Sequence, residues 1–419
     1  MADLKPVRGT HDLLPDKMRQ HRAVIDAARR IVRLYGFEEI ATPIFEFTEV
    51  FQRTLGDTSD VVTKEMYSFE DRNGDLLTLR PENTAGVARC FISEGLAHQT
   101  PLKFFYSGPM FRRERPQRGR LRQFHQIGVE LIGVGSPGAD VDAIAAAYRT
   151  LDALGILSKI KLELNSLGDL ESRNAYRAAL INYFTPHKKN LSHDGRMRLE
   201  HNPLRILDSK DEADRELVAE APVLSDYLTE NSRNFFLSVQ EGLVQLGIDF
   251  EVNRRLVRGL DYYGQTTFEF VTKNLGAQGT VLAGGRYDSL IEQMGGPSTP
   301  GVGWAAGIER LVMLIDNPLE DSPIFAIVPI GQAAVEKAKM LAEQIRDEGL
   351  VVDLAYAGNI SRRMKRANRI GASASLIFGD EELDRNVVQL RDMKTGEQSE
   401  ISLKAVVAEL THYCKKDVD

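Results

Sequence analysis

Two strand-like segments on either side of an arginine-rich loop constrain the fold of this 419-residue chain most strongly. Residues 102–111, LKFFYSGPMF, and residues 123–133, QFHQIGVELIG, are rich in the aromatic and branched residues that favour β-strands. Strands that are joined by a short loop pair antiparallel. We therefore expect an antiparallel sheet whose margin carries the loop.

The loop, residues 112–122, contains six arginines and no lysine, although the chain has a formal net charge of −7. A guanidinium group is a rigid fork that matches phosphate oxygens, whereas a lysine is a mobile point charge. Arg112 stands at the strand end, where the sheet can hold it, so we interpret it as a fixed phosphate clamp. The arginines from Arg115 to Arg122 form a collar for a polyanion; a solvated loop is the alternative.

Composition and cysteine usage indicate an intracellular globular protein of two or three domains, with 42% hydrophobic and 27% charged residues. No apolar run approaches the roughly 20 residues of a membrane span, and the N-terminus lacks the apolar segment of a signal peptide. Cys90 and Cys414 lie far apart without CxxC spacing. This pattern favours a reducing compartment and no cysteine-ligated zinc. We expect a cytoplasmic protein without a metal site.

The periodicity along the chain predicts an α+β domain over residues 1–320 and an α/β domain over residues 321–419, separated by the linker DNPLEDSP. The first domain is expected to be an antiparallel sheet flanked by helices. It should contain a helix at 15–35, a strand at 37–47, a hairpin at 66–80 that turns at Asn73-Gly74, and a helical insertion at about 170–250. Pro43 should place its strand at an edge or an interface.

One face of the strand at 123–133 is polar. Alternation places Gln126, Gly128 and Glu130 on one side, with a gap at Gly128 that a small polar ligand could fill. A solvent-facing strand side is the alternative. Tyrosines opposite a carboxylate suit an amphoteric ring such as neutral imidazole. The segments VRGLDYYGQ and AGGRYDSL supply the candidate tyrosines Tyr262, Tyr263 and Tyr287. The first segment also supplies Arg258 as a candidate site residue.

Two further segments could bind phosphates. In GVGWAAGIER, Arg310 should extend over the space left by Gly307, one helical turn earlier. The glycines of this segment resemble a dinucleotide fingerprint, but the last spacing is one residue too long and no strand precedes it, which argues against such a site. SRRMKRANR, residues 361–369, has five basic residues and no acid. It is either a nucleic-acid contact or a solvated helix face.

These segments together resemble a known family. FRRERPQRGRLRQFHQ resembles motif 2 of class II aminoacyl-tRNA synthetases, TPIFEF resembles motif 1, and PGVGWAAGIER resembles motif 3. LVRGLDYY and AGGRYDSL are similar to the two signatures of the bacterial-type histidyl-tRNA synthetases. The resemblance spans the whole chain, and the C-terminal α/β unit resembles the family's anticodon-binding domain. Leu121 stands where an aromatic residue is more frequent, and Trp304 where phenylalanine is.

The resemblance implies a homodimer that ligates L-histidine to tRNA(His) through a histidyl adenylate, with ATP as a substrate accompanied by Mg²⁺. It implies catalytic and ATP-binding roles for Arg258, Arg112, Glu114 and Arg310. It implies histidine-binding roles for Glu82, Thr84, Gln126, Glu130, Tyr262, Tyr263 and Tyr287. It implies tRNA-binding roles for Arg118, Arg120, Arg362, Arg363, Lys365 and Arg366.

Two non-catalytic alternatives are open. The regulatory subunit of ATP phosphoribosyltransferase shares the fold, but it generally lacks the anticodon-binding domain and the arginine-rich motif 2. An RNA-binding protein without catalysis would not need a pocket formed by Glu82, Gln126 and Glu130. This sequence contains both an anticodon-binding-like domain and an arginine-rich motif 2, so ligase activity is the stronger expectation.

Overall fold

The computed structural model describes residues 4–55, 61–117, 119–209, 211–257, 262–276, 279–316 and 323–416. The chain divides into two compact units, residues 1–318 and 319–419. Among the described residues, no helix has the length and apolar character needed to cross a bilayer.

The first unit is organised by an eight-stranded sheet with the order β1-β5-β6-β11-β10-β9-β7-β8. Neighbouring strands are antiparallel except for the pairs β1–β5 and β7–β8. Every residue of β5 pairs with one of β6, from Leu102 opposite Ile132 to Phe111 opposite Gln123, which confirms the expected antiparallel pairing. The strands are β1 (Glu38–Glu39), β5 (Leu102–Phe111), β6 (Gln123–Ile132), β7 (Lys161–Ser166), β8 (Glu251–Val252), β9 (Gly264–Val271), β10 (Thr280–Arg286) and β11 (Gly301–Gly307).

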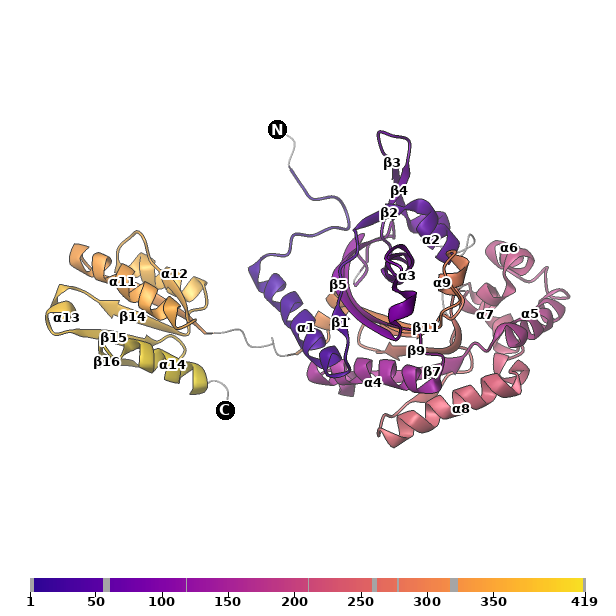
Figure 1. Cartoon of the computed structure of the whole chain (residues 1–419). Coiled ribbons are helices and arrows are strands. Elements are labelled where there is room, and N and C mark those ends of the chain that lie inside the picture. The colour runs from indigo at the N-terminus through magenta and orange to yellow at the C-terminus, as the bar shows by residue number, and fades with distance from the viewer. Residues whose placement is uncertain are drawn as a thin grey trace. The chain divides into compact units, whose positions relative to one another are not determined.

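Helices cover this sheet on both faces (Figure 1). Contacts join α1 to α4 and α4 to α8, so these three helices form one layer. On the other side, α2, α3 and α9 pack together around a core that includes Phe51, Phe91 and Ile291. The helices are α1 (Pro15–Leu34), α2 (Thr48–Leu55), α3 (Thr84–Ser93), α4 (Pro137–Ala153), α8 (Glu230–Gln245), α9 (Leu290–Gln293) and α10 (Ile308–Val312).

The strand expected at residues 37–47 is in fact two short strands that belong to different sheets. β1 pairs with β5, whereas β2 (Phe45–Phe47) joins β3 (Tyr67–Glu70) and β4 (Leu76–Leu79) in a three-stranded sheet with the order β2-β4-β3. Pro43 lies between the two strands and has no N–H to donate to a ladder, which accounts for the interruption. The expected edge position is confirmed, because β1 and β2 each stand at the edge of their sheet.

The connection between β3 and β4 is longer than the expected two-residue turn. Asp71 closes a loop over residues 71–75, and its carboxylate accepts the backbone N–H groups of Asn73 and Asp75. Gly74 has a φ of 89°, which explains the glycine at this position.

The insertion between β7 and β8 is helical, as predicted. It consists of α5 (Leu170–Phe184), α6 (His193–His201), α7 (Glu212–Ala219) and α8, with a core of its own around Tyr176, Leu180 and Phe184. Asp214 on α7 is buried within the insertion. It accepts hydrogen bonds from the hydroxyls of Ser192 and Ser209, which precede α6 and α7.

The second unit contains a five-stranded sheet with the order β13-β12-β14-β15-β16, in which the first three strands are parallel. The sequence predicts its elements up to the closing hairpin, and the structure adds α13 and α14. The elements are β12 (Ile324–Pro329), α11 (Gln332–Asp347), β13 (Val351–Leu354), α12 (Ile360–Arg369), β14 (Ala374–Phe378), α13 (Asp380–Asp384), β15 (Val387–Asp392), β16 (Gln398–Ser402) and α14 (Val406–Lys416).

A buried ion pair connects the sheet of the first unit to the start of α4. The side chains of Arg286 and Asp140 are both 0% exposed, and the guanidinium Nε lies 3.0 Å from Asp140 Oδ2. The same guanidinium donates to the carbonyls of Val134 and Ser136 and to Asp288. All these partners share one cation, so its loss would leave them without their donor and would leave the buried Asp140 without its counter-charge.

We expect Asp140→Ala to lower the free energy of unfolding by about 3–5 kcal/mol, because it leaves a buried cation without its counter-charge. Chemical denaturation of the purified variant measures this change. Asp142→Ala is a matched control in the same helix, since Asp142 is 49% exposed and pairs with Lys103. We expect it to cost less than about 1 kcal/mol. Equal costs for the two variants would contradict the assignment.

Candidate functional site

A pocket of about 610 Å³ opens on the first unit between α3, the loop after β5, the strands β6, β9 and β10, and α10. It brings together most of the residues that the sequence predicts. Those lining it are Glu82, Thr84, Arg112, Glu114, Arg120, Gln126, Tyr262, Tyr263 and Arg310. Arg118 and Arg258 lie outside the described residues.

Glu82 is placed by the start of α3. Its two carboxylate oxygens accept the backbone N–H groups of Thr84, at 2.8 Å, and of Ala85, at 2.9 Å. Burial raises the pKa of Glu82, and these two hydrogen bonds oppose the shift. The carboxylate therefore both caps a helix, where negative charge is favourable, and faces the pocket.

Glu130 and Tyr287 lie behind the lining rather than in it. Glu130 is 1% exposed and accepts the Thr84 hydroxyl at 2.7 Å and the Tyr287 hydroxyl at 2.5 Å. Burial raises the pKa of Glu130 to about 8, although those two hydrogen bonds lower it. Burial therefore favours the protonated carboxyl over the carboxylate at this position.

The expected gap over Gly128 is filled. A Cβ atom at Gly128 would lie 2.4 Å from the phenol carbon and oxygen of Tyr106, a fully buried side chain on β5. The glycine thus makes room for a neighbouring tyrosine and not directly for a ligand. Burial raises the pKa of the Tyr106 hydroxyl well above its usual range, so it stays protonated. Because β5 pairs with β6, Tyr106 lies opposite Gly128. In the sequence, only the expected pairing of these two strands indicated that Tyr106 could fill the space over Gly128.

The arginines of the pocket are held by carbonyl and carboxylate groups. Arg112 Nε donates to the Pro81 carbonyl at 2.9 Å, and its guanidinium lies over the Phe124 ring. Arg120 pairs with Glu114 at 2.8 Å. Arg112 is therefore tied to the segment before α3, and Arg120 to Glu114 within the loop itself.

Arg310 occupies the place that the sequence predicts. Its side chain passes 3.8 Å from the Cβ position of Gly307, and it donates to the carbonyls of Gly119 at 3.0 Å and Thr280 at 2.6 Å. The helix α10 begins at Ile308, because residues up to Gly307 still pair with β6. Burial lowers the pKa of Arg310, and the neighbouring Arg120 and Arg112 add to this effect.

Two arginines that the sequence analysis missed join the insertion to the pocket. Arg255 donates to the carbonyls of Ala219, Ala221 and Pro222, and it lines the pocket itself. Arg173 on α5 donates to the Tyr263 carbonyl at 3.1 Å. Neither residue lies in a motif, so only the packing of the insertion reveals them.

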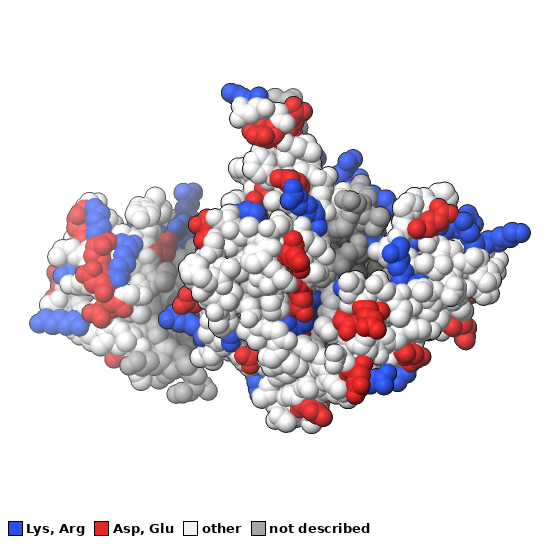
Figure 2. Space-filling model, turned by 45° about the vertical axis from the view of Figure 1, so that its right-hand side comes forward, with Lys and Arg blue, Asp and Glu red and all other residues white. Residues whose placement is uncertain are grey.

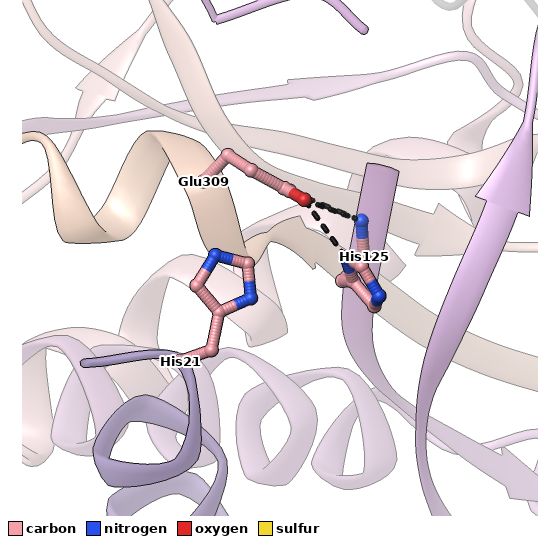
Figure 3. A group of neighbouring side chains, drawn as sticks. All are labelled: His21, His125 and Glu309. Atoms are coloured by element: carbon pink, nitrogen blue, oxygen red, sulfur yellow. Dashed lines mark hydrogen bonds and ion pairs between the residues drawn. The ribbon is translucent and has the colours of Figure 1, made fainter. Parts of the chain in front are cut away.

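One cluster of side chains has metal-ligating groups (Figure 3). His21 on α1, His125 on β6 and Glu309 on α10 offer ligand atoms within 4.8 Å of one another. Both Glu309 oxygens already accept the His125 N–H at 3.0 Å, and Glu309 Oε1 lies 2.9 Å from His125 Nδ1. These contacts indicate an internal connection between strand and helix.

The basic helix α12 lies in the second unit. Arg366 forms a two-point ion pair with Asp353, at 2.6 and 2.8 Å, and Arg363 donates to the Pro329 carbonyl. Arg362, Lys365 and Arg369 are exposed. On the face of the molecule seen in Figure 2, acidic and basic side chains are interspersed, so charge alone does not mark a nucleic-acid surface there.

Comparison with known proteins identifies relatives over nearly the whole chain. A family model described as histidyl-tRNA synthetase matches residues 9–172 and 189–311, and one described as an anticodon binding domain matches residues 325–413. A histidine–tRNA ligase of Rhodospirillum rubrum is 62% identical over 404 residues, which cover 96% of this chain and 97% of the relative. A histidine–tRNA ligase of Gluconobacter oxydans is 55% identical, with 96% and 97% covered.

A solved structure is similar as well. Histidyl-tRNA synthetase from S. aureus, without ligand, superposes with a TM-score of 0.80 at 34% identity, and the match covers 97% of this chain and 99% of the other. The expected fold class is confirmed.

The raised pKa of Glu130 predicts a pH-dependent effect of its replacement. From pH 4.5 to about 8 the folded state keeps a proton that the unfolded state has lost, so this group makes the protein less stable as pH rises. Glu130→Gln removes that penalty. We expect the melting temperature of the ligand-free variant, relative to the unaltered protein, to increase from pH 5 to pH 9. Glu241→Gln, on the exposed surface of α8, should show no such trend, and a flat difference for Glu130→Gln would contradict the shift.

Proposed function

This chain belongs to the histidyl-tRNA synthetase family, and we propose that it joins L-histidine to tRNA(His) in two steps. In the first step a histidine carboxylate oxygen bonds to the α-phosphorus of ATP while pyrophosphate leaves. In the second step the histidyl group passes to the terminal ribose of the tRNA, and AMP is released. The observation that carries the proposal is one pocket that combines arginines with a tyrosine-rich, carboxylate-containing floor.

Three arginines would act on the triphosphate. Arg112 is fixed by the Pro81 carbonyl, so we propose that it holds the α-phosphate, with Glu114 beside the nucleotide. Arg310 would take the outer phosphates, and Arg258 would be the main catalytic charge. Displacement at phosphorus depends mostly on positioning and on fixed positive charge, which such guanidinium groups provide.

Histidine would bind above the floor of the pocket. We propose that Glu82, Thr84 and Gln126 bind its amino group, because Gln126 Oε1 is buried and has no hydrogen-bond partner among the described residues. Glu130 and Tyr263 would contact the imidazole, and Tyr262 and Tyr287 would complete the wall. The protonated carboxyl of Glu130 can donate to a ring nitrogen and its carboxylate can accept from one, so either state matches neutral imidazole.

Magnesium would enter with ATP as part of the substrate. Mg²⁺ prefers carboxylate and phosphate oxygens, and the pocket offers carboxylates at Glu114 and Glu269, so the donor set fits the ion.

The second unit would bind the anticodon arm of the tRNA. Because Arg363 and Arg366 have partners inside the unit, we propose that they set the position of α12, while the exposed Arg362, Lys365 and Arg369 contact phosphates. Arg120, together with Arg118, would serve the acceptor end of the tRNA.

The three-stranded sheet supports a homodimer. Its apolar side chains face outward and its polar side chains face inward, which is the reverse of an ordinary surface sheet. Its outward face carries Phe45 and Phe47, each 53% exposed, and Phe69, whereas Glu46 and Thr78 point inward and are buried. Exposed apolar faces of this kind mark interaction sites. We propose that a second copy of the chain covers this face.

The regulatory-subunit alternative is not favoured, because relatives that are more than half identical over nearly the whole chain are ligases. We propose a cytoplasmic location, which the two separated cysteines support.

Histidine-dependent exchange of pyrophosphate into ATP tests the activity. We expect exchange by the unaltered protein, and a loss of about a hundredfold or more in Arg258→Ala, because removal of one fixed donor at the transition state typically costs about 2.7–4 kcal/mol. Arg258→Lys should recover only part of the rate, since a point charge cannot reproduce the fork. A normal rate with an unstable Arg258→Ala protein would indicate a purely structural arginine.

The exposed cations of α12 should matter for tRNA alone. We expect the combined replacement of Arg362, Lys365 and Arg369 by alanine to weaken tRNA charging and to make tRNA binding fall less steeply as salt rises, while pyrophosphate exchange stays unchanged. Replacing Lys337 and Lys339 on α11 is the matched control. Undiminished charging at moderate salt would remove the assignment of α12.

Interruption of the apolar face should separate the dimer. We expect Phe45→Glu combined with Phe47→Glu to halve the mass measured by light scattering at micromolar concentration. Leu170→Glu, at an exposed leucine of the insertion, should leave the mass unchanged. A monomeric unaltered protein that is active would disprove the dimer.

A further inference from the structure

The carboxylate of Glu309 extends the hydrogen bonding of the sheet where a strand ends. The last pair between β11 and β6 joins Gly307 to Gln126, and the chain then turns into α10. The next residue of β6, His125, therefore faces a helix. Glu309 reaches back from α10, and its two oxygens accept the His125 backbone N–H at 3.0 Å each.

The His125 side chain completes this contact (Figure 3). Its Nδ1 lies 2.9 Å from Glu309 Oε1, so backbone and ring converge on one carboxylate. His21 covers the pair from α1, with its ring edge-on to that of His125 at a centroid distance of 5.3 Å and an interplanar angle of 85°. His21 is buried, and burial lowers its pKa, which favours a neutral ring at this contact.

The two joined residues each precede a residue of the pocket. Gln126 follows His125, and Arg310 follows Glu309; Gln126 and Arg310 line the pocket, and so does Glu309 itself. The Gln126 amide would face the amino acid and the Arg310 guanidinium the outer phosphates, according to the proposed function. The Glu309–His125 contact therefore joins the strand that carries Gln126 to the helix that carries Arg310.

We propose that Glu309 and His125 are positioning residues that fix the spacing between Gln126 and Arg310, and with it the alignment of histidine against ATP. The inference rests on the proposed function. A misplacement of about 1 Å between reacting groups can lower a rate by about a hundredfold, so a contact one residue away from each side chain can control the reaction.

Glu309→Gln tests the contact with little change in size. A glutamine offers one acceptor oxygen, and its NH₂ would face the N–H donors of His125. We expect kcat for pyrophosphate exchange to fall about tenfold or more, because the substrates are misaligned, and the KM values for ATP and for histidine each to rise about tenfold, which is about 1.4 kcal/mol for each substrate. Glu241→Gln on α8 is the control and should leave both KM values unchanged.

Double variants separate positioning from a general loss of structure. In an Arg310→Ala background, we expect Glu309→Gln to raise the KM for ATP little further, and in a Gln126→Ala background to raise the KM for histidine little further. Unchanged KM values in the single variant, or fully additive effects in both backgrounds, would overturn the inference while leaving the proposed function intact. An absence of histidine-dependent exchange in the unaltered protein would overturn both.

Discussion

The pocket depends on burying the carboxyl group of Glu130 at its floor. A Cβ atom at Gly303 would lie 2.0 Å from Glu130 Oε2, and one at Gly301 would lie 2.3 Å from the ring of Tyr287, the hydrogen-bond donor to that carboxyl. Only glycine fits at either position. Two of the glycines that look like a nucleotide fingerprint in the sequence, Gly301 and Gly303, therefore make space for a carboxyl group and a phenol, which bring β6, β11 and the end of β10 together.

Local patterns were sufficient to predict most of the elements, because they carry their own signals: helical periodicity in α1, a turn at Gly74, and hydrophobic strands separated by linkers. The errors arose where tertiary pairing decides. Pro43 divides the segment 37–47, expected as one strand, between two sheets, and the ring that fills the space over Gly128 comes from Tyr106 on another strand. A single strand shows which side chains share a face but not what lies opposite them.

The insertion was predicted as helical but without a role, since its sequence has no chemical motif. The structure ties it to the pocket through backbone carbonyls: Arg255 donates to three of them at and after the end of α7, and Arg173 donates to the Tyr263 carbonyl. Every residue type has a backbone carbonyl, so a contact to a carbonyl requires no particular residue in the sequence. Sequence reasoning therefore missed these contacts. These contacts join the insertion to segments that line the pocket, and Leu207 of the insertion lines it directly.

The arginines of the pocket show how an acidic protein can present a strong positive site. Arg112, Arg120 and Arg310 converge on one pocket, and both burial and the neighbouring cations lower the pKa of Arg310. Carbonyl groups at Pro81, Gly119 and Thr280 hold two of these guanidiniums in place despite their mutual repulsion. A triphosphate would replace that repulsion with attraction without requiring the side chains to reorganise. Folding thus supplies the free energy that brings these cations together, and a bound polyanion would relieve their repulsion.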